Sequence, residues 1–405
     1  MPETEAGRAL ASFAIALAVL GACALVGRRT GQGGSRALSW TALLAGAAAT
    51  GALLGADASA RIDSLQAAFV VMVAAAFTLR PARLSAGRAR DILYLLGAST
   101  LAATLLIDTL GAEAPVPSGY WFALAGAWLL AWAGNDRLAA FEPGSKALAT
   151  LVSIAVPLVF GAWLLILWEC LVRGLEVPRV LLPAPSAILQ RFAASTSILW
   201  ADFVQTFVRS VLVGWALGCA AGFAVGVAID RSPFLKRGLL PIGNLASALP
   251  IVGLAPIMVM WFGFDWQSKV AVVVVMTFFP MLVNTVAGLA ASSAMQRDLM
   301  RGYGASYLQT LLKLRLPEAL PFLFNALKIN STLALIGAIV AEFFGTPVVG
   351  MGFRISTEVG RMNVDMVWAE IAVAALAGSA FYGLLALLER IATHWHPSVR
   401  GRAAH

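Results

Sequence analysis

Eleven apolar runs, most of them long enough to cross a membrane, divide this sequence from end to end, with short polar loops between them. A helix needs about 17–25 apolar residues to cross a bilayer, and in lipid it satisfies its own backbone hydrogen bonds. The runs occupy residues 9–27, 38–56, 65–79, 92–110, 119–135, 147–170, 204–229, 239–262, 268–291, 320–344 and 367–391. The sequence therefore predicts an all-α polytopic membrane protein with about eleven transmembrane helices.

The composition favours a membrane protein over a soluble one. Hydrophobic residues make up 60% of the chain and charged residues 12%, whereas soluble domains carry roughly 25% charged residues. The net charge of +8 would also suit a nucleic-acid-binding protein, but the Arg and Lys residues lie in short loops, where they set membrane topology. We therefore expect contact with membrane lipids and no nucleic-acid partner.

The loop charges predict an orientation in the membrane. When the loops are assigned alternately to two sides, one side holds most of the Arg and Lys residues and includes Arg400 and Arg402 of the tail. Basic loops stay in the cytoplasm. Eleven spans thus place the N-terminus outside and the C-terminus in the cytoplasm. The first residues, MPETEAGR, lack the positive region of a secretory signal.

The chain changes character near residue 145. Residues 1–145 are rich in Ala, Leu and Gly and have few polar residues inside their apolar runs. Residues 146–405 have longer loops, more prolines and more polar residues within the runs. This change predicts an N-terminal membrane extension of about five helices, whose role the sequence does not indicate, followed by a domain of six helices.

A glycine recurs at every fourth position of the run 204–229. At helical spacing such residues form a face with almost no side chains, which lets a neighbouring helix approach closely. Two interpretations fit: tight packing against a neighbouring helix, or a surface along which a rocking helix slides. The glycines are Gly214, Gly218, Gly222 and Gly226.

Several polar residues lie inside the later apolar runs. Lipid-facing positions disfavour polar side chains, so these residues are expected to face other helices or a water-filled path. Hydrogen bonding between helices explains each residue taken singly, whereas a polar translocation path explains the group. The candidates for the path are Asn244, Ser247, Asn284, Asn330, Ser331 and Glu342.

The stretch GASYLQTLLKLRLP, residues 304–317, is a basic segment between two apolar runs. Ser306 is a suitable N-cap and Gly304 permits a sharp turn before it. Pro317 is expected to end this short helix and to begin the next span. The helix would carry leucines on one face, namely Leu308, Leu311 and Leu312. It would lie on the lipid surface or be held by a cytoplasmic partner.

At this stretch the chain resembles the permeases of binding-protein-dependent ABC importers. Their cytoplasmic motif reads EAA, three residues, Gly, nine residues, Ile, one residue, Leu-Pro. With the Gly placed on Gly304, the later positions fall on Leu314, Leu316 and Pro317, and the EAA positions fall on Asp298, Leu299 and Met300, where only the acid is kept in kind. The resemblance implies a coupling helix near residues 296–317 that docks into an ATPase subunit. The residues it assigns to this role are Asp298, Arg301, Gly304, Ala305, Leu314, Leu316 and Pro317.

Two further stretches resemble the nitrate, sulfonate, taurine and bicarbonate group of these permeases. They are WECLVRGLEVPRVLLPAPSAILQRF, residues 168–192, and AEFFGTPVVGMGFRI, residues 341–355. The resemblance spans about residues 147–395 and implies the six-helix core of a type I importer permease in a bacterial inner membrane. The implied solute is nitrate, a sulfonate such as taurine, a related anion, or a pyrimidine or riboflavin-type precursor. Nothing in the sequence selects among them.

The resemblance also implies partners. They are two copies of an ABC ATPase, a periplasmic or lipid-tethered solute-binding protein, and a second permease, most simply another copy of this chain. An alternative from another class is an ATP-independent carrier or a membrane scaffold that retains a permease-like half. A third, a membrane-bound enzyme, is disfavoured because no paired carboxylates or His cluster lie at one membrane depth.

The sequence contains no pattern for catalysis or for a cofactor. It has no GxxxxGK[ST] phosphate-binding loop and no HExxH, so ATP and Mg²⁺ are expected on the separate ATPase and not on this chain. Its cysteines, Cys23, Cys170 and Cys219, lie within apolar runs and form no CxxC. We therefore expect no disulfide framework, no metal site and no catalytic residue.

Overall fold

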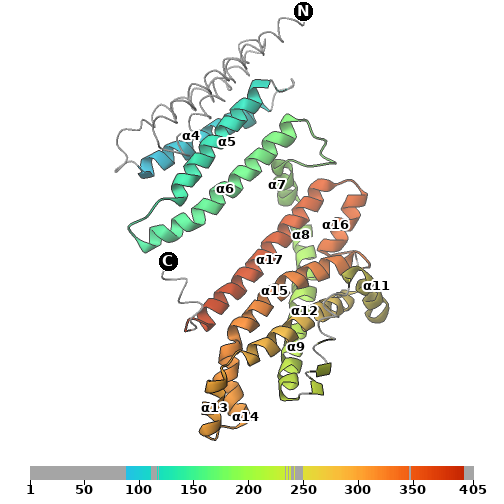
Figure 1. Ribbon diagram of the computed structural model, residues 1–405. Helices are drawn as coiled ribbons and strands as arrows, with labels where there is room; N and C mark the ends of the chain where they lie inside the picture. Colours follow the sequence, from blue (N-terminus) through green and yellow to red (C-terminus); the bar gives the residue numbers. More distant parts are fainter. Residues whose placement is uncertain are drawn as a thin grey trace, which may run out of the picture. The chain divides into compact units, whose positions relative to one another are not determined.

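The computed structural model describes residues 88–395, apart from residues 111–115, 117, 233, 236, 239–240, 242–249 and 346–347. The predicted runs 9–27, 38–56 and 65–79 therefore lie outside the described residues. Every regular element within the described part is helical (Figure 1). The all-α architecture of a membrane permease thus agrees with the sequence, while the total of eleven spans stays a prediction.

The described helices follow one another along the chain. Before the residues left undescribed near 240, they are α4 (Arg88–Thr109), α5 (Ser118–Ala139), α6 (Lys146–Gly174), α7 (Pro185–Ala194), α8 (Thr196–Phe203), the π-helical η1 (Val204–Leu212) and α9 (Val213–Arg231). After them come α11 (Ile251–Phe262), α12 (Trp266–Ala290), α13 (Ala294–Gly302), α14 (Tyr307–Thr310), the π-helical η2 (Leu311–Arg315), α15 (Leu316–Glu342), α16 (Met351–Gly360) and α17 (Val364–Ala392).

Five helices of the described part are long and apolar enough to cross a membrane. They are Lys146–Gly174, Thr196–Arg231, Trp266–Ala290, Tyr307–Glu342 and Val364–Ala392. Each contains or largely covers one of the apolar runs of the second half of the sequence. The second and fourth are continuous helices, because π-helical turns join α8 to α9 and α14 to α15.

The chain forms two compact units, and the first ends at Ser186. Within it, α4, α5 and α6 share an apolar core that includes Leu106, Leu130 and Trp163. α6 therefore packs with the helices that precede it and belongs to the first compact unit. The sequence boundary near residue 145 concerns a different property, the extent of the permease core, and it stays a prediction.

The second unit, Ala187–His405, is built around α12. One side of α12 packs on α9, and another packs on α15. The aromatic rings of Phe207, Trp215 and Phe381 meet where η1, α9 and α17 come together. This unit contains α7 to α17 and every described residue that the sequence analysis assigned to coupling, to the path or to glycine packing.

The helix expected at residues 306–317 begins after its predicted N-cap, Ser306, but the prediction that it ends at Pro317 is wrong. The structure continues this helix through Pro317, so that Tyr307–Glu342 is one span of 36 residues. The N–H of Leu316 bonds to the carbonyl of Leu311, five residues back. Such a π-helical turn widens the helix where the proline ring would otherwise meet a carbonyl. The separate short helix is α13, and Gly304 follows it.

Candidate functional site

The loop between α12 and α14 holds a well-defined helix, α13. Its N-cap Ser293 accepts a hydrogen bond from the N–H of Gln296, and the Gln296 side chain accepts one from the N–H of Ser293. This reciprocal capping box satisfies two N–H groups that the start of a helix leaves without partners. Ser306 and Gln309 form a second capping box at the start of α14. The starts of α13 and α14 are therefore fixed by their capping residues.

Gly304 forms the turn between these two helices. Its φ of +68° lies in the left-handed region, a backbone conformation that residues other than glycine rarely adopt. The N–H groups of Gly304 and Ala305 bond to the carbonyls of Arg301 and Met300, at 2.9 and 3.0 Å, which closes α13. No atom lies within 4 Å of where a Cβ on Gly304 would stand. The backbone conformation, and not lack of space, therefore requires glycine here.

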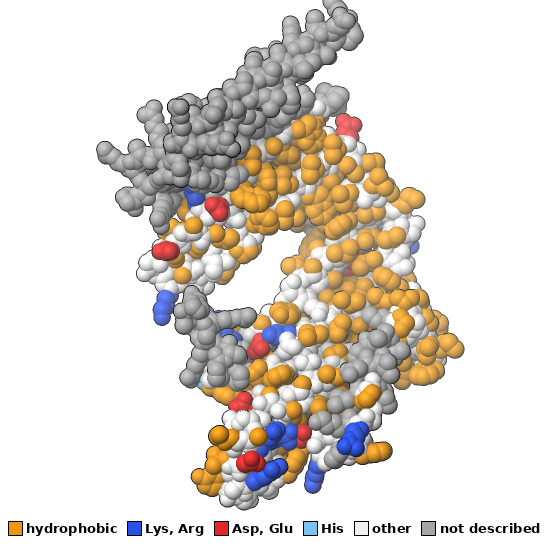
Figure 2. Space-filling model, viewed as in Figure 1, with side chains coloured by type: hydrophobic (Ala, Val, Ile, Leu, Met, Phe, Trp, Pro, Cys, Tyr) orange, Lys and Arg blue, Asp and Glu red, His pale blue; other side chains and the backbone are white. Residues whose placement is uncertain are grey.

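α13 presents large apolar side chains to the surface. The side chains of Met295, Leu299 and Tyr303 are 82%, 60% and 80% exposed. An exposed ion pair, Asp298 with Arg301 at 3.2 Å, lies among them. Figure 2 shows basic, acidic and hydrophobic side chains together at the α13 end of the second unit. Exposed apolar side chains that are spaced four residues apart beside charges are typical of a surface that binds another protein or a membrane.

The residues assigned to coupling fall into two groups in the structure. Asp298 and Arg301 lie on α13, and Gly304 and Ala305 form the turn, so all four belong to the exposed loop. The other three are half-buried on η2 and the first turn of α15: Leu314, Leu316 and Pro317. The predicted leucine face also divides, because Leu308 and Leu312 are exposed whereas Leu311 is buried.

Arg315 connects this loop to two other helices, a contact that the sequence analysis missed. Its guanidinium group donates two hydrogen bonds to Asp230 of α9, at 2.6 and 2.7 Å, and one to the carbonyl of Leu289 in α12, at 2.9 Å. Tyr307 also donates a hydrogen bond to Asp230, at 3.2 Å. Asp230 and Arg315 are 85 residues apart in the chain, and no local pattern links them.

The path candidates that the structure describes on α12 and α15 bond to carbonyls. Asn330 of α15 donates to the carbonyl of Thr277, at 2.7 Å, and to the sulfur of Cys219, and so connects α15 to α12 and α9. Ser331 and Asn284 bond to carbonyls of their own helices. Asn244 and Ser247 lie outside the described residues. A role in a path stays a prediction for all of them.

Glu342, the remaining path candidate, lies in a buried network at the other end of α15. Its carboxylate accepts hydrogen bonds from the Thr206 hydroxyl, at 2.8 and 3.0 Å, and from the N–H of Gly352, at 2.7 Å. The Thr206 hydroxyl in turn accepts one from the N–H of Met351, at 2.8 Å. A Cβ on Gly350 would lie 2.7 Å from this carboxylate. The first turn of α16 therefore rests directly on Glu342.

A second carboxylate, Asp202 of α8, holds the same turn of α16. It accepts hydrogen bonds from the N–H of Gly350, at 2.6 Å, and from the Arg354 side chain, at 2.8 Å. Burial alone would lower the pKa of Arg354, but the hydrogen bond and charge of Asp202 outweigh it, so the pKa is raised. The sequence analysis missed Asp202 and Arg354, which are 152 residues apart.

The glycine face of α9 packs on α12. A Cβ on Gly218 would lie 2.0 Å from the Thr277 hydroxyl, and one on Gly222 would lie 2.4 Å from the carbonyl of Phe278. Cβ atoms on Gly214 and Gly226 would lie 2.6 and 2.7 Å from side chains of α12. All four glycines are buried. The two helix backbones therefore approach so closely that no side chain fits between them.

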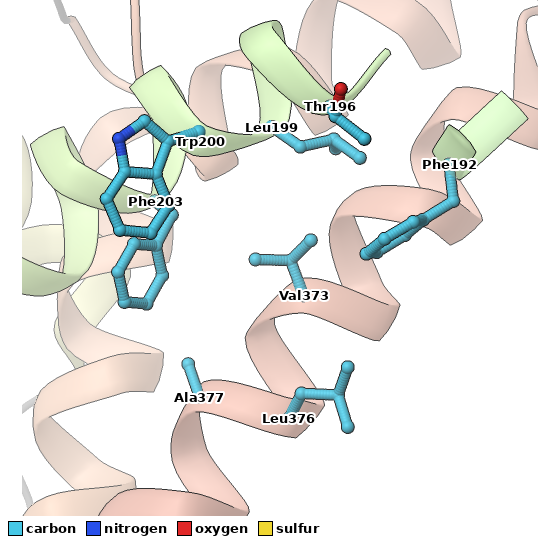
Figure 3. A pocket seen from close by; sticks show the side chains of 8 residues that line it. All are labelled: Phe192, Thr196, Leu199, Trp200, Phe203, Val373, Leu376 and Ala377. Atoms are coloured by element: carbon cyan, nitrogen blue, oxygen red, sulfur yellow. The ribbon is translucent and has the colours of Figure 1, made fainter. Parts of the chain in front are cut away.

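An apolar pocket of about 260 Å³ lies between α7, α8 and α17 of the second unit (Figure 3). Its lining residues are Phe192, Thr196, Leu199, Trp200, Phe203, Val373, Leu376 and Ala377. Thr196 supplies the one polar side chain of this lining. The lining carries no charged side chain and is mainly apolar, so the pocket is poorly suited to a small charged solute.

In the part of the chain that the structure describes, no three His, Cys, Asp or Glu side chains are placed to hold a metal ion. Cys170 and Cys219 are buried free thiols. The expectation that this chain carries no cofactor of its own stays a prediction.

Comparison with known proteins gives a consistent set of similarities. The family model of the binding-protein-dependent transport system inner membrane component matches residues 216–401. A formylaminopyrimidine transport permease of Halalkalibacterium halodurans is 30% identical, over 59% of this chain and 95% of that protein. A riboflavin transport system permease of Chloroflexus aurantiacus is 31% identical, over 58% of this chain and 88% of that protein. A taurine transport system permease of Escherichia coli is 27% identical, over 59% of this chain and 89% of that protein.

Proposed function

Because the chain belongs to the binding-protein-dependent inner-membrane permeases of ABC importers, we propose that its α13 loop, Ser293–Ser306, is the docking site for the ATPase. The chain is a transport subunit and not an enzyme. It is a multi-pass protein of the inner membrane, and permeases of this family associate with an ABC ATPase and a solute-binding protein.

One observation carries the docking proposal: the exposed apolar surface of α13. Leaving large apolar side chains in contact with water is unfavourable, and this surface exposes three of them: Met295, Leu299 and Tyr303. A partner that covers these side chains gains the free energy of burying them, roughly 25 cal/mol for each Å² of apolar surface. The surrounding Asp298 and Arg301 supply charges that orient a partner. The capping boxes hold this surface in one conformation before the partner arrives.

The remaining parts of the proposed assembly are those that the resemblance and the loop charges imply. Two copies of the chain would form the translocation path, each with one ATPase that carries ATP and Mg²⁺. The α13 loop would lie in the cytoplasm, with the N-terminus outside and the C-terminus inside, and the binding protein would deliver a small solute from outside. Residues 146–405 would form the permease domain, preceded by the membrane extension 1–145. The distribution of basic loops supports this orientation.

The path proposal rests on the polar residues of the spans. Asn330 lies where α9, α12 and α15 meet, and its side-chain oxygen is buried without a hydrogen-bond partner in the described part of the chain. Such a group gains a partner when water or a polar solute reaches it. Glu342 would act at the outer end of the path by holding α16. The proposed solute is nitrate, a sulfonate such as taurine, a related anion, or a pyrimidine or riboflavin-type precursor.

Leu299→Glu tests the docking site. The substitution places a carboxylate in the centre of the apolar patch, so we expect the ATPase recovered with the tagged chain to fall at least about tenfold, a loss of roughly 1.4 kcal/mol or more. The measurement is a pull-down in mild detergent from the native host, with the ATPase quantified by mass spectrometry. Because Leu299 is 60% exposed, the fold is expected to remain intact.

Met362→Glu is the matched control, since Met362 is 68% exposed at the opposite end of the second unit, after α16. It should recover as much ATPase as the unmodified chain. Undiminished ATPase with Leu299→Glu would contradict the docking site. If the unmodified chain itself recovers none, an ATP-independent carrier or scaffold would replace the importer assembly.

A further inference from the structure

Three helices meet at the guanidinium group of Arg315, at the end of the second unit where α13 lies (Figure 1). Arg315 is the last residue of η2, and it binds both oxygens of Asp230 at 2.6 and 2.7 Å. Its Nε donates to the carbonyl of Leu289 at 2.9 Å. Asp230 lies in the last turn of α9 and Leu289 in the last turn of α12. We call Asp230, Leu289 and Arg315 the helix junction.

The position of Arg315 is electrostatically favourable. The last turns of α9 and α12 both leave carbonyl groups without partners in the helix, and the end of a helix dipole carries partial negative charge. The guanidinium group satisfies one such carbonyl and neutralises Asp230 through two parallel bonds, the geometry in which Arg binds a carboxylate most strongly. The side chains of Arg315 and Asp230 are only 13% and 11% exposed. Water therefore competes little for these bonds.

A second residue that follows the docking loop contacts the same carboxylate. The hydroxyl of Tyr307, the first residue of α14, donates to Asp230 at 3.2 Å. The guanidinium group of the neighbouring Arg231 lies 5.3 Å from the centre of the Tyr307 ring, a distance typical of a cation–π contact. Asp230 thus contacts both the beginning of α14 and the end of η2, directly after the α13 loop.

α9 packs closely on α12 along its glycine face. The glycine face of α9 places its backbone against α12 along Gly214, Gly218, Gly222 and Gly226. A displacement of Arg315 acts on both helices at once, because its guanidinium group bonds to Asp230 of α9 and to Leu289 of α12. The exposed ion pair on α13, Asp298 with Arg301, connects residues of one helix only and cannot carry a displacement to another span.

We propose that Asp230 is the positioning residue that transmits movement of the docked ATPase to the α9–α12 pair, through its two bonds to Arg315. The proposal rests on the docking function given above. When the α13 loop is displaced, either the junction breaks, which leaves two charges unpaired in a poorly hydrated site, or α9 and α12 follow. The first outcome is costly, so the helices follow.

The test uses the permease–ATPase complex in lipid nanodiscs with the solute-binding protein of the same transport system. We expect binding of the solute-binding protein at the outer face to change the rate of ATP hydrolysis through the helices that the junction connects. The measured quantity is the rate of ATP hydrolysis per bound ATPase with the binding protein, divided by the rate without it. For Asp230→Asn this ratio should fall to roughly one, the value for uncoupled sites. Asp230→Glu, which keeps the carboxylate, should retain most of the ratio.

Glu389→Gln is the matched control. Glu389 pairs with Lys328 between α17 and α15, with side chains 23% and 17% exposed, but the pair includes no residue of the loop. Its ratio should equal that of the unmodified complex. Arg315→Lys keeps the charge without the two parallel bonds and should behave as Asp230→Asn, which provides a second variant if the first does not fold.

The outcomes separate this proposal from the docking function. An unchanged ratio in Asp230→Asn, with the ATPase still bound, would overturn the role of Asp230 and leave the docking site in place. An equal loss in Glu389→Gln would overturn it as well, because any buried ion pair would then suffice. Failure of the unmodified chain to bind an ATPase would instead overturn the docking function.

Discussion

Gly218→Leu is expected to prevent folding of the second unit. A Cβ at this position alone would lie 2.0 Å from the Thr277 hydroxyl and 2.8 Å from the carbonyl of Val274. The second of these atoms belongs to the backbone, so α9 and α12 must separate to accept any side chain. Overpacking a tight core costs about 1–3 kcal/mol and occasionally more, and a leucine adds three further carbon atoms to the clash.

The measurement is the yield and apparent Tm of the purified protein in detergent, with Gly218→Ala as a milder version. We expect Gly218→Ala to lower Tm and Gly218→Leu to leave no folded protein. Gly161→Ala is the control, because no atom lies within 4 Å of a Cβ at Gly161 in α6. Alanine there should keep or raise stability, by up to about 1 kcal/mol. Equal behaviour of the two alanine variants would contradict the packing of α9 on α12.

Thr206→Val is expected to release the first turn of α16. The hydroxyl of Thr206 donates to Glu342 and accepts from the N–H of Met351. Valine has nearly the same shape but removes both bonds and leaves buried polar groups without partners. Such a loss costs about 2 kcal/mol, which corresponds to a local opening equilibrium raised roughly thirtyfold.

Amide hydrogen exchange across Gly350–Gly360 measures this opening, since exchange of protected amides follows local unfolding. Thr206→Ser is the matched control, because serine keeps the hydroxyl group, and it should leave the exchange nearly unchanged. The core of α12 should stay protected in both variants. Equal exchange of α16 in the valine and serine variants would show that the hydroxyl group does not hold this turn.

The helices that cross the membrane could be predicted from sequence because their signal is local. An apolar run of sufficient length must be a helix in lipid, and the runs that begin at 147, 268 and 367 correspond to α6, α12 and α17. The glycines at 214–226 could be placed on one face of a helix from their spacing alone. The helix on which they pack required the structure.

The helix predicted from Ser306 begins where expected, but its predicted end at Pro317 was wrong for a physical reason. A proline interrupts an ordinary α-helical turn because its ring meets the carbonyl four residues back, and for that reason the sequence predicts that Pro317 starts a new helix. Here a π-helical turn precedes Pro317, so the helix continues. The sequence did contain a signal for α13, namely Ser293 followed three residues later by Gln296, the spacing of a capping box. That signal indicates a second helix, which precedes the one capped by Ser306.

The charged contacts could not have been predicted from one sequence. Asp230 and Arg315 are 85 residues apart, and Asp202 and Arg354 are 152 residues apart. Each pair forms only because packed spans bring helix ends together, which no periodicity or spacing records. Asp202 and Asp230 were therefore overlooked, although they hold the two ends of the second unit.

The most direct test of ATPase docking is photo-crosslinking in intact membranes of the native host. A photoreactive amino acid is incorporated at position 299 on α13 or, as the control, at position 362 after α16, and the linked proteins are identified by mass spectrometry. The account predicts that position 299 links to an ATPase with a phosphate-binding loop and that position 362 does not. Links from position 299 to lipid alone, while the same ATPase co-purifies with the chain, would show that it binds elsewhere.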